Sequence, residues 1–232
     1  MMGLLNLLAG KLIVSCQALP DEPLHGASVM AKMANAAYLG GAGGIVANGA
    51  QDIVAIKAQV TLPVIGVLNR HYSDSTVCLT PTVADIHGLM VAEPDLISIE
   101  TGFRHRPGGE RLEDVLLEIR THYPRVLLLA AVATLEEALL AQDLGYDGIT
   151  TATYGYTPES KGKHLSDDNY AHLKALCHAV ALPILAEGGI NTPEQAACAL
   201  RCGAHCIVVG GAITRPQNIT RAFVNGLSLQ GR

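Results

Sequence analysis

Eight short apolar runs alternate with eight amphipathic segments along nearly the whole chain. The runs are rich in Val, Ile and Leu, as expected of parallel strands that are covered on both faces. They span residues 12–15, 44–47, 64–68, 96–99, 126–130, 148–151, 184–186 and 207–209. The segments between them predict helices over residues 28–39, 51–59, 82–90, 112–123, 135–144, 167–179, 193–201 and 216–225. Eight strand–helix units in succession predict an α/β fold, a closed (β/α)8 TIM barrel.

The length and composition of the chain fit one such barrel. Its 232 residues are 49% apolar and 16% charged, so the chain is long enough to bury a full core and too apolar to be disordered. Because no linker or change of composition interrupts the pattern, we expect one domain over residues 1–232. The alternative is an open, flavodoxin-like sheet, which would leave about three of the strand–helix units unexplained.

Charge and hydropathy argue against several kinds of partner. A net charge of −5 without a cluster of Lys or Arg argues against nucleic acid. No apolar run approaches the roughly 18–20 residues that a membrane span needs. The chain begins with an apolar stretch that lacks a basic segment and continues into the first predicted strand, so a signal peptide is not expected. A cytoplasmic protein is the resulting expectation.

The cysteines and histidines do not show the spacing of metal ligands. None of the six cysteines forms a CxxC pair, and most lie in apolar stretches, which is typical of buried free thiols in a reducing compartment. His172 and His178 are six residues apart, so they do not share a helix face as ligands four residues apart would. We therefore expect no metal site.

Two glycine pairs near the end of the chain predict a phosphate site. Gly188-Gly189 follows the seventh apolar run and Gly210-Gly211 follows the eighth, each ahead of a predicted helix. Glycines let backbone N–H groups approach an anion, and a helix N-terminus adds a positive dipole end. TIM barrels often bind phosphate after strands seven and eight. Arg215 could add a charge-assisted hydrogen bond; the alternatives are simple tight turns and a surface arginine.

Glu187 ends the seventh predicted strand, where a barrel carries its catalytic groups. A carboxyl group in a barrel mouth with little water can have its pKa raised towards the range that proton transfer needs. We interpret Glu187 as an acid–base residue, with a structural ion pair as the alternative. Gln17, just after the first strand, is expected to hydrogen-bond either the substrate or a neighbouring loop.

A series of short motifs extends almost from end to end of the chain. In order they are Leu12-Ile-Val-Ser-Cys-Gln17, Met30-Ala-Lys-Met33, Ala47-Asn-Gly49, Leu62-Pro-Val-Ile-Gly66, Thr134-Leu-Glu-Glu137, Gly155-Tyr-Thr-Pro158, Ala186-Glu-Gly188, Asn191-Thr-Pro-Glu-Gln195 and Ala212-Ile-Thr-Arg-Pro216. In this order and spacing they resemble the N-acetylmannosamine-6-phosphate 2-epimerase family of bacterial sialic-acid breakdown. The resemblance implies interconversion of N-acetylmannosamine 6-phosphate and N-acetylglucosamine 6-phosphate by removal and return of the C2 proton, without metal or nicotinamide. It also implies that Glu187 is the second proton-transfer group and that the protein is a homodimer.

The chain departs from this family around the expected centre of proton transfer. The lysine implied as general base is Asn69, whose amide cannot take a proton from carbon. An arginine expected near the substrate is Val46, and an expected aspartate is Ala131. Further departures are Glu100-Thr-Gly-Phe103 for Asp-Ala-Thr-Lys, Thr151-Ala-Thr-Tyr154 for Thr-Thr-Leu-Ser, and Gly189 for Arg. The resemblance therefore covers the scaffold and the phosphate site better than the catalytic centre.

Titratable residues near the missing lysine are candidates to replace it. His71 has a suitable ordinary pKa, although a solvated loop histidine is the simpler interpretation, and Glu100 is the second candidate. Asn69 and Arg70 are candidate substrate-binding residues; Arg70 could bind sugar hydroxyls or pair with Glu100 or Asp95. The basic run at residues 104–106 predicts a flexible loop that could shield an anionic substrate.

The expected function is that of an isomerase, an epimerase of a phosphorylated amino sugar in amino-sugar and sialic-acid catabolism. The alternatives are an epimerase with a different sugar phosphate and a barrel that binds a phosphosugar without catalysis. An unrelated phosphate-binding lyase or synthase would not explain the Val-Ser-Cys-Gln and Asn-Thr-Pro-Glu-Gln motifs. Because Asn69 replaces the base, we predict slow turnover of N-acetylmannosamine 6-phosphate.

Overall fold

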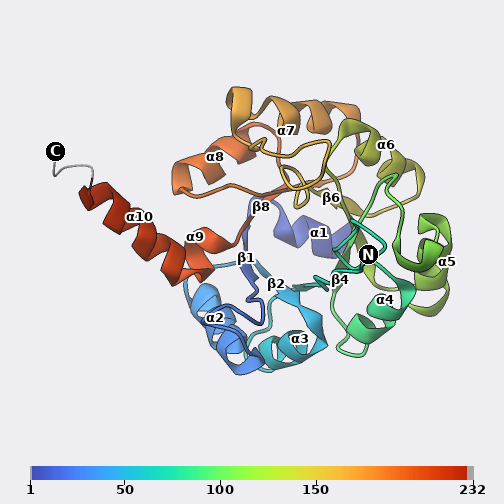
Figure 1. The fold of residues 1–232 in the computed structure, drawn as a ribbon, viewed down its shortest axis with the longest axis horizontal. Coiled ribbons are helices and arrows are strands. Elements are labelled where there is room, and N and C mark those ends of the chain that lie inside the picture. Colours follow the sequence, from blue (N-terminus) through green and yellow to red (C-terminus); the bar gives the residue numbers. More distant parts are fainter. Residues whose placement is uncertain (1, 229–232) are drawn as a thin grey trace.

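Eight parallel strands form a closed barrel in the computed structural model, which describes residues 2–228 (Figure 1). Each strand pairs with the next one along the chain, and β8 pairs with β1. The strands are β1 Leu12–Cys16, β2 Gly44–Asn48, β3 Val64–Val67, β4 Leu96–Glu100, β5 Leu127–Ala131, β6 Gly148–Thr150, β7 Ile184–Glu187 and β8 Cys206–Val209. The predicted barrel is confirmed and the open sheet is wrong. The expected domain also includes residues 1 and 229–232, which lie outside the described residues.

The eight predicted helices are present, with bounds within a few residues of those expected. They are α2 Ala27–Leu39, α3 Gly49–Lys57, α4 Val83–Met90, α5 Leu112–His122, α6 Leu135–Asp143, α7 Asp167–Ala179, α8 Pro193–Arg201 and α10 Pro216–Ser228. Local capping explains two of the starts. Thr134 and Glu137 form a capping box at α6, and Thr192 and Gln195 form one at α8. None of the described helices is long and apolar enough to cross a membrane.

Three short elements were not predicted: α1 Met2–Leu8, the 3-10 helix η1 Pro107–Gly109 and α9 Gly211–Thr214. The apolar start of the chain forms α1 before it reaches β1. Leu5 and Leu8 pack in one cluster with residues at the strand starts, including Leu96 and Leu127. His205 Nε2 also lies 2.8 Å from the Leu5 carbonyl oxygen. Helix α1 therefore covers the N-terminal end of the barrel, which leaves the C-terminal ends of the strands as its mouth.

Apolar residues fill both the barrel interior and the layer between strands and helices. The interior cluster includes Ile65, Leu129 and Leu185. The outer layer packs the other faces of the strands, such as Ile99 on β4, against helix residues such as Val115 on α5. This double burial explains why the strands read as continuous apolar runs. Polar side chains enter the interior mainly at the C-terminal ends of the strands.

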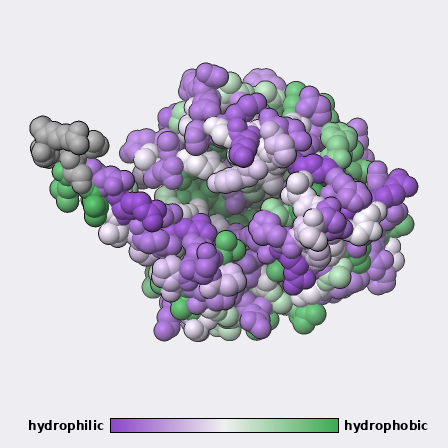
Figure 2. Space-filling view, viewed as in Figure 1, coloured by the Kyte–Doolittle hydropathy of each residue, from purple (hydrophilic) through white to green (hydrophobic). Residues whose placement is uncertain are grey.

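Helix α10 departs from the pattern of the other helices that follow strands. Figure 1 shows it extending away from the barrel as an arm, while α2 to α8 lie around the ring. Its residues Phe223 and Leu227 are 72% and 74% exposed. Figure 2 shows hydrophobic residues on this arm, next to the grey atoms at its end. Among the described residues, a groove is thereby left open on the outer face of β8 and β1.

Candidate active site at the barrel mouth

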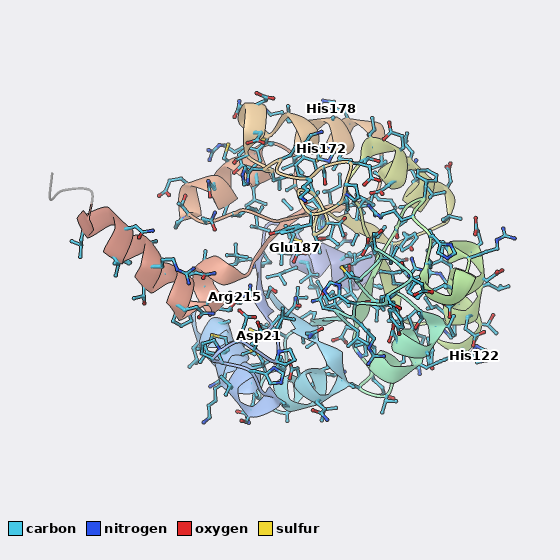
Figure 3. All side chains as sticks on the ribbon, viewed as in Figure 1. Asp21, His122, His172, His178, Glu187 and Arg215 are labelled. Atoms are coloured by element: carbon cyan, nitrogen blue, oxygen red, sulfur yellow. The ribbon has the colours of Figure 1, made fainter. Side chains whose placement is uncertain are left out.

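Glu187 lies at the end of β7, towards the middle of the ring of strands in Figure 3. Its Oε2 accepts a hydrogen bond from Thr150 Oγ1 at 2.8 Å. The hydroxyl of Thr151 donates to the Glu187 carbonyl at 2.7 Å and accepts from the Glu187 N–H at 2.9 Å. Burial raises the pKa of the Glu187 carboxyl, and the hydrogen bond from Thr150 opposes that rise. The arrangement gives a fixed carboxyl group that is easier to protonate than an exposed one.

The cavity that Glu187 lines is small and mostly apolar. Its volume is about 30 Å³, comparable to the space of one water molecule. The polar side chains that line it are Gln17, Ser98, Thr150 and Glu187, and the buried Ser98 hydroxyl has no hydrogen-bond partner among the described residues. Val46, which stands where the family has an arginine, also lines it. Glu187 is the only titratable group in this lining.

A chain of amides occupies the side of the mouth near β3. Asn69 Nδ2 donates to Gln17 Oε1 at 2.9 Å, and Gln17 Nε2 donates to Ser15 Oγ at 2.9 Å. The backbone N–H of Asn69 donates to Asn48 Oδ1 at 2.9 Å. The structure thus brings Asn69 and Gln17 together, and Gln17 bonds a neighbouring loop residue here. These groups can donate and accept hydrogen bonds, but they cannot act as bases at ordinary pH.

The two glycine pairs follow β7 and β8, on the other side of the mouth. Gly188 has φ 104° and Gly189 has φ 68°, a left-handed backbone that other residues rarely adopt. A Cβ on Gly210 would lie 3.5 Å from the Ser15 Cβ, so the turn after β8 packs closely on β1. Gly211 begins α9, and Arg215 follows that helix at the root of the arm (Figure 3). The predicted phosphate-binding residues therefore gather around β7, β8 and α9.

The two candidate replacement bases do not line the cavity. Glu100 is buried, and its Oε2 accepts from the N–H groups of Cys78 and Leu79 at 2.8 and 3.0 Å. Its Oε1 lies 3.4 Å from Arg104 Nε. His71 is exposed on the loop after β3. A role for either residue as the base stays a prediction, and this placement does not favour it.

The positively charged residues expected near substrate are largely held by other groups. Arg70 pairs with Asp85 at 2.7 Å, not with Glu100 or Asp95. Arg106 is 4% exposed and donates to three carbonyl oxygens, those of Thr80, Pro81 and Glu100.

Arg104, from the same basic run, pairs with three carboxylates, those of Glu100, Glu137 and Glu159. Residues 104–106 form a loop, as expected; Arg104 and Arg106 are held by groups of the barrel, while His105 is exposed. The run packs the segment after β4 onto the barrel. Its partner Glu100 is close in the sequence, whereas Glu137 and Glu159 are distant along the chain.

Several site residues were not found by sequence reasoning. Thr150, Thr151 and Ser98 surround Glu187, and the only signal for them is a polar residue at or near a strand end. Glu22, in the loop after β1, pairs with Arg215. Nothing in the sequence pattern links these two residues, which are 193 positions apart.

Comparisons with known proteins agree with one another over most of the chain. A family model described as "Putative N-acetylmannosamine-6-phosphate epimerase" matches residues 30–228. A protein of Enterobacter sp. (strain 638) with the name "Putative N-acetylmannosamine-6-phosphate 2-epimerase" is 50% identical, over 97% of this chain and 95% of its own length. A protein of the same name from Shouchella clausii (strain KSM-K16) is 48% identical, over 98% of this chain and 100% of its own.

Solved structures give the same result for the fold. The N-acetylmannosamine-6-phosphate 2-epimerase from Clostridium perfringens matches with a TM-score of 0.90 and 43% identity, over 95% of each chain. A thiamine phosphate pyrophosphorylase from Pyrococcus furiosus matches with a TM-score of 0.59 and 19% identity, over 91% of this chain and 90% of its own. The second likeness concerns the fold alone.

Proposed function

Because the chain belongs to the N-acetylmannosamine-6-phosphate epimerase family, we propose that it interconverts N-acetylmannosamine 6-phosphate and N-acetylglucosamine 6-phosphate. The observation that carries this proposal is the position of Glu187. Its carboxyl group, with a raised pKa, lies in the barrel mouth directly before the Gly188-Gly189 turn. A phosphosugar anchored at the glycine turns would thus extend its other end towards the only titratable group of the cavity.

The chemistry assigned to Glu187 is proton transfer at C2 of the open-chain sugar. The carboxylate takes the C2 proton, and the electron pair of the C–H bond moves to C1 and its oxygen to form an enolate. We assign the hydrogen bonds to that oxygen to the amide groups of Gln17 and Asn69, each of which has a second N–H beside the one that it donates within the protein. Return of a proton to the opposite face of C2 gives the epimer. Because Asn69 cannot supply that proton, we expect turnover to be slow.

The phosphate is assigned to the backbone of Gly188–Gly189 and Gly210–Gly211, with Arg215 as the charged donor. Two observations support this assignment. Gly188 and Gly189 have a left-handed backbone after β7, and α9 begins at Gly211 directly after β8. The proposal also includes one domain over all 232 residues and a cytoplasmic location. The six free cysteines support a reducing compartment.

Exchange of the C2 proton tests the function directly. The unaltered protein is incubated in D2O with each hexosamine 6-phosphate, and loss of the C2 proton signal is followed by NMR, with Glu187→Gln as the matched control. We expect slow exchange in both sugars that the control lacks. Tight phosphosugar binding without exchange would instead support the second candidate, a binding barrel without catalysis, which the substitution at Asn69 favours.

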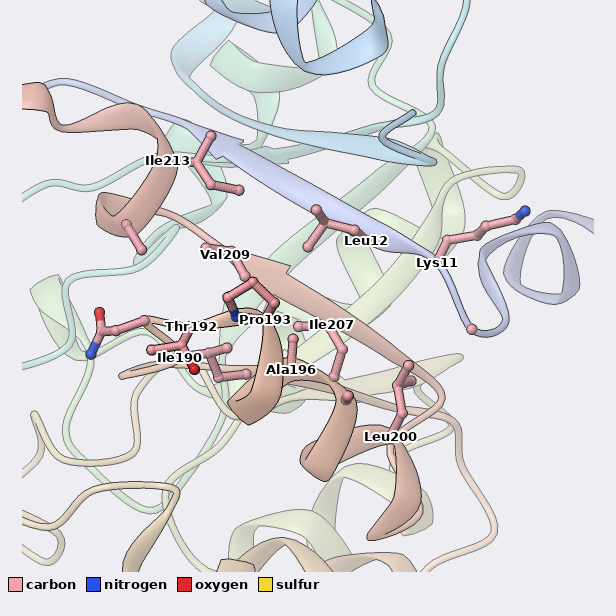
Figure 4. Close-up of a pocket in the computed structure, with 14 residues that line it drawn as sticks. Lys11, Leu12, Ile190, Thr192, Pro193, Ala196, Leu200, Ile207, Val209 and Ile213 are labelled. Atoms are coloured by element: carbon pink, nitrogen blue, oxygen red, sulfur yellow. The ribbon is translucent and has the colours of Figure 1, made fainter. Parts of the chain in front are cut away.

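We further propose that the protein is a homodimer in which the arms are exchanged. A groove of about 440 Å³ lies on the outer face of β8 and β1, beside α8 (Figure 4). Its apolar lining includes Leu12, Ile190, Leu200, Ile207 and Val209. This is where the helix after β8 would complete the helical layer. On α10, Ile219, Phe223 and Leu227 recur every four residues and so share one face, which matches the groove in chemistry.

Oligomeric state tests the arm exchange. Phe223→Asp with Leu227→Asp should convert a dimer to a monomer in light scattering at micromolar concentration, because two charges would enter an apolar groove. Asn225→Asp, on the same arm but off the apolar face, is the control and should leave the mass unchanged. A monomer in the unaltered protein, or a dimer that survives the double substitution, contradicts the exchange.

A further inference from the structure

Arg215 and Glu22 form a two-point ion pair beside the glycine turn after β8. Arg215 Nε lies 2.5 Å from Glu22 Oε1, and Arg215 Nη2 lies 2.8 Å from Glu22 Oε2. The Arg215 side chain is 32% exposed and that of Glu22 is 17% exposed. Such a pair fixes the plane of a guanidinium group, whereas a single contact would let it rotate.

The contact with Glu22 uses Nε and Nη2 of Arg215 and leaves Nη1 close to Gly211, at the start of α9. Arg215 Nη1 is not part of the pair with Glu22, and it would lie 3.8 Å from a Cβ on Gly211. A phosphate seated at Gly210–Gly211 would therefore meet Nη1 without displacing the Glu22 carboxylate. If Glu22 competed with phosphate for Arg215, its carboxylate would instead bind Nη1, the nitrogen close to Gly211.

Glu22 is itself held in place by its own loop. Its Oε2 accepts from the Leu19 N–H at 2.9 Å, and the Glu22 N–H donates to the Leu19 carbonyl at 2.9 Å. The hydrogen bonds from Arg215 lower the pKa of the Glu22 carboxyl, so it is ionised at neutral pH. On the other side, Thr214 Oγ1 donates to the Ser15 carbonyl at 3.0 Å and fixes the backbone before Arg215 to β1.

We propose that Glu22 is a positioning residue, which orients Arg215 so that Nη1 is ready to bind the phosphate of the substrate. The inference rests on the proposed function, since it needs the phosphate at the glycine turns. An unpaired arginine would lose side-chain freedom on binding, and the pair with Glu22 removes that cost before the ligand arrives. Glu22 acts through Arg215 and does not touch the reacting atoms.

Phosphate affinity in a double-substitution cycle tests this role. Affinities for inorganic phosphate and for N-acetylglucosamine 6-phosphate are measured by calorimetry for Glu22→Ala, Glu22→Gln, Arg215→Ala and Glu22→Ala/Arg215→Ala. We expect Glu22→Ala to raise Kd about tenfold and Glu22→Gln to raise it less, because the amide oxygen can still accept one hydrogen bond from Arg215. In the Arg215→Ala background the Glu22 substitution should change Kd less than twofold.

Asp21→Asn is the matched control, because it removes an exposed carboxylate next to Glu22 in the chain and near Arg215 in Figure 3. It should leave Kd unchanged, which separates the orientation of Arg215 from general charge repulsion. In the exchange assay Glu22→Ala should raise KM with kcat unchanged. Thermal unfolding confirms that each variant is folded.

Three outcomes overturn the inference. If Glu22→Ala binds phosphate as tightly as the unaltered protein or more tightly, Glu22 does not prepare Arg215. If its effect persists in full without Arg215, Glu22 acts by another route. If Arg215→Ala leaves phosphate affinity unchanged, the phosphate assignment under the proposed function fails as well, and the positioning role fails with it. If Arg215→Ala loses phosphate affinity and Glu22→Ala does not, the phosphate assignment stands and only the role of Glu22 is overturned.

Discussion

The two sides of the barrel mouth differ in their chemistry. The side formed by β7, β8 and α9 carries the carboxyl group of Glu187, the glycine turns and Arg215 with its partner Glu22. The side near β2 and β3 carries a chain of neutral amides that links Gln17, Asn69 and Asn48. Each strand of a barrel contributes its own loop, so one side of the mouth can change while the other is kept. We therefore expect substrate anchoring and proton transfer to be separable in this protein.

The largest effect is expected for Glu187→Gln. Positioned acid–base groups are commonly worth 10²- to 10⁴-fold in rate, and Glu187 is the only titratable group that lines the cavity. We therefore expect C2 exchange to fall by at least about 10²-fold, while phosphosugar affinity changes little. Rates from NMR and Kd from calorimetry on the same preparation check both parts. Equal exchange rates in the two proteins would place the proton-transfer group elsewhere.

Asn69→Lys tests whether the altered side of the mouth can regain its chemistry. A lysine at this position would replace the hydrogen bond from Asn69 to Gln17 and add a group that can carry a proton. We expect epimerisation to rise by about 10²-fold, the lower end of what acid–base catalysis contributes. Asn69→Met, similar in length and unable to titrate, is the control. A rise in both variants would mean that the size of the side chain, and not its proton, causes the gain. No rise in either would mean that positions 46 and 131 also need the arginine and aspartate of the family in place of Val46 and Ala131.

Arg215→Ala tests the side of the mouth that is assigned to phosphate binding. We expect phosphosugar binding to weaken by about 1.5–3 kcal/mol, the usual contribution of a hydrogen bond to a charged group. The exposed Arg221 on the same arm pairs with Asn218 at 3.2 Å and serves as a matched control. Arg221→Ala should leave the affinity unchanged. If Arg215→Ala and Arg221→Ala bind the phosphosugar equally well, Arg215 does not anchor the substrate on this side of the mouth.

The same division separates what the sequence could and could not predict. Glu187 and the glycine turns were predicted because strand ends in a barrel meet at one face, so their position in the chain gives their position in space. The pair of Arg215 with Glu22 and that of Arg70 with Asp85 depend on how loops fold against one another. Such contacts leave no periodic signal.

Secondary structure follows a similar rule. The strands and the longer helices carry the periodicity of their class and were predicted nearly at their bounds. Helix α1 has seven residues and α9 has four, which is too short for a helical period to stand out from an apolar run. The direction of α10 could not be predicted, because an amphipathic helix pattern does not say which surface covers its apolar face.

The smallest effect concerns the pH dependence of stability. Burial raises the folded-state pKa of Glu187 above its unfolded value, so the folded state keeps the proton to higher pH. The stability gained by holding that proton is present below the unfolded pKa, about 4.3, and is lost as pH rises through the folded pKa. Glu187→Gln does not titrate, and its amide oxygen can still accept the hydrogen bond from Thr150.

The variant should therefore gain stability relative to the unaltered protein as pH rises above the unfolded pKa of about 4.3, and the two should differ least at the acid end. Urea unfolding of both proteins at several pH values measures the difference, in which all other titrating groups cancel. A difference that stays constant with pH would mean that the Glu187 carboxyl titrates alike in the folded and unfolded chains. Glu187 would then behave as a solvated carboxylate. The side of the mouth formed by β7, β8 and α9 would have no group with a pKa suited to proton transfer.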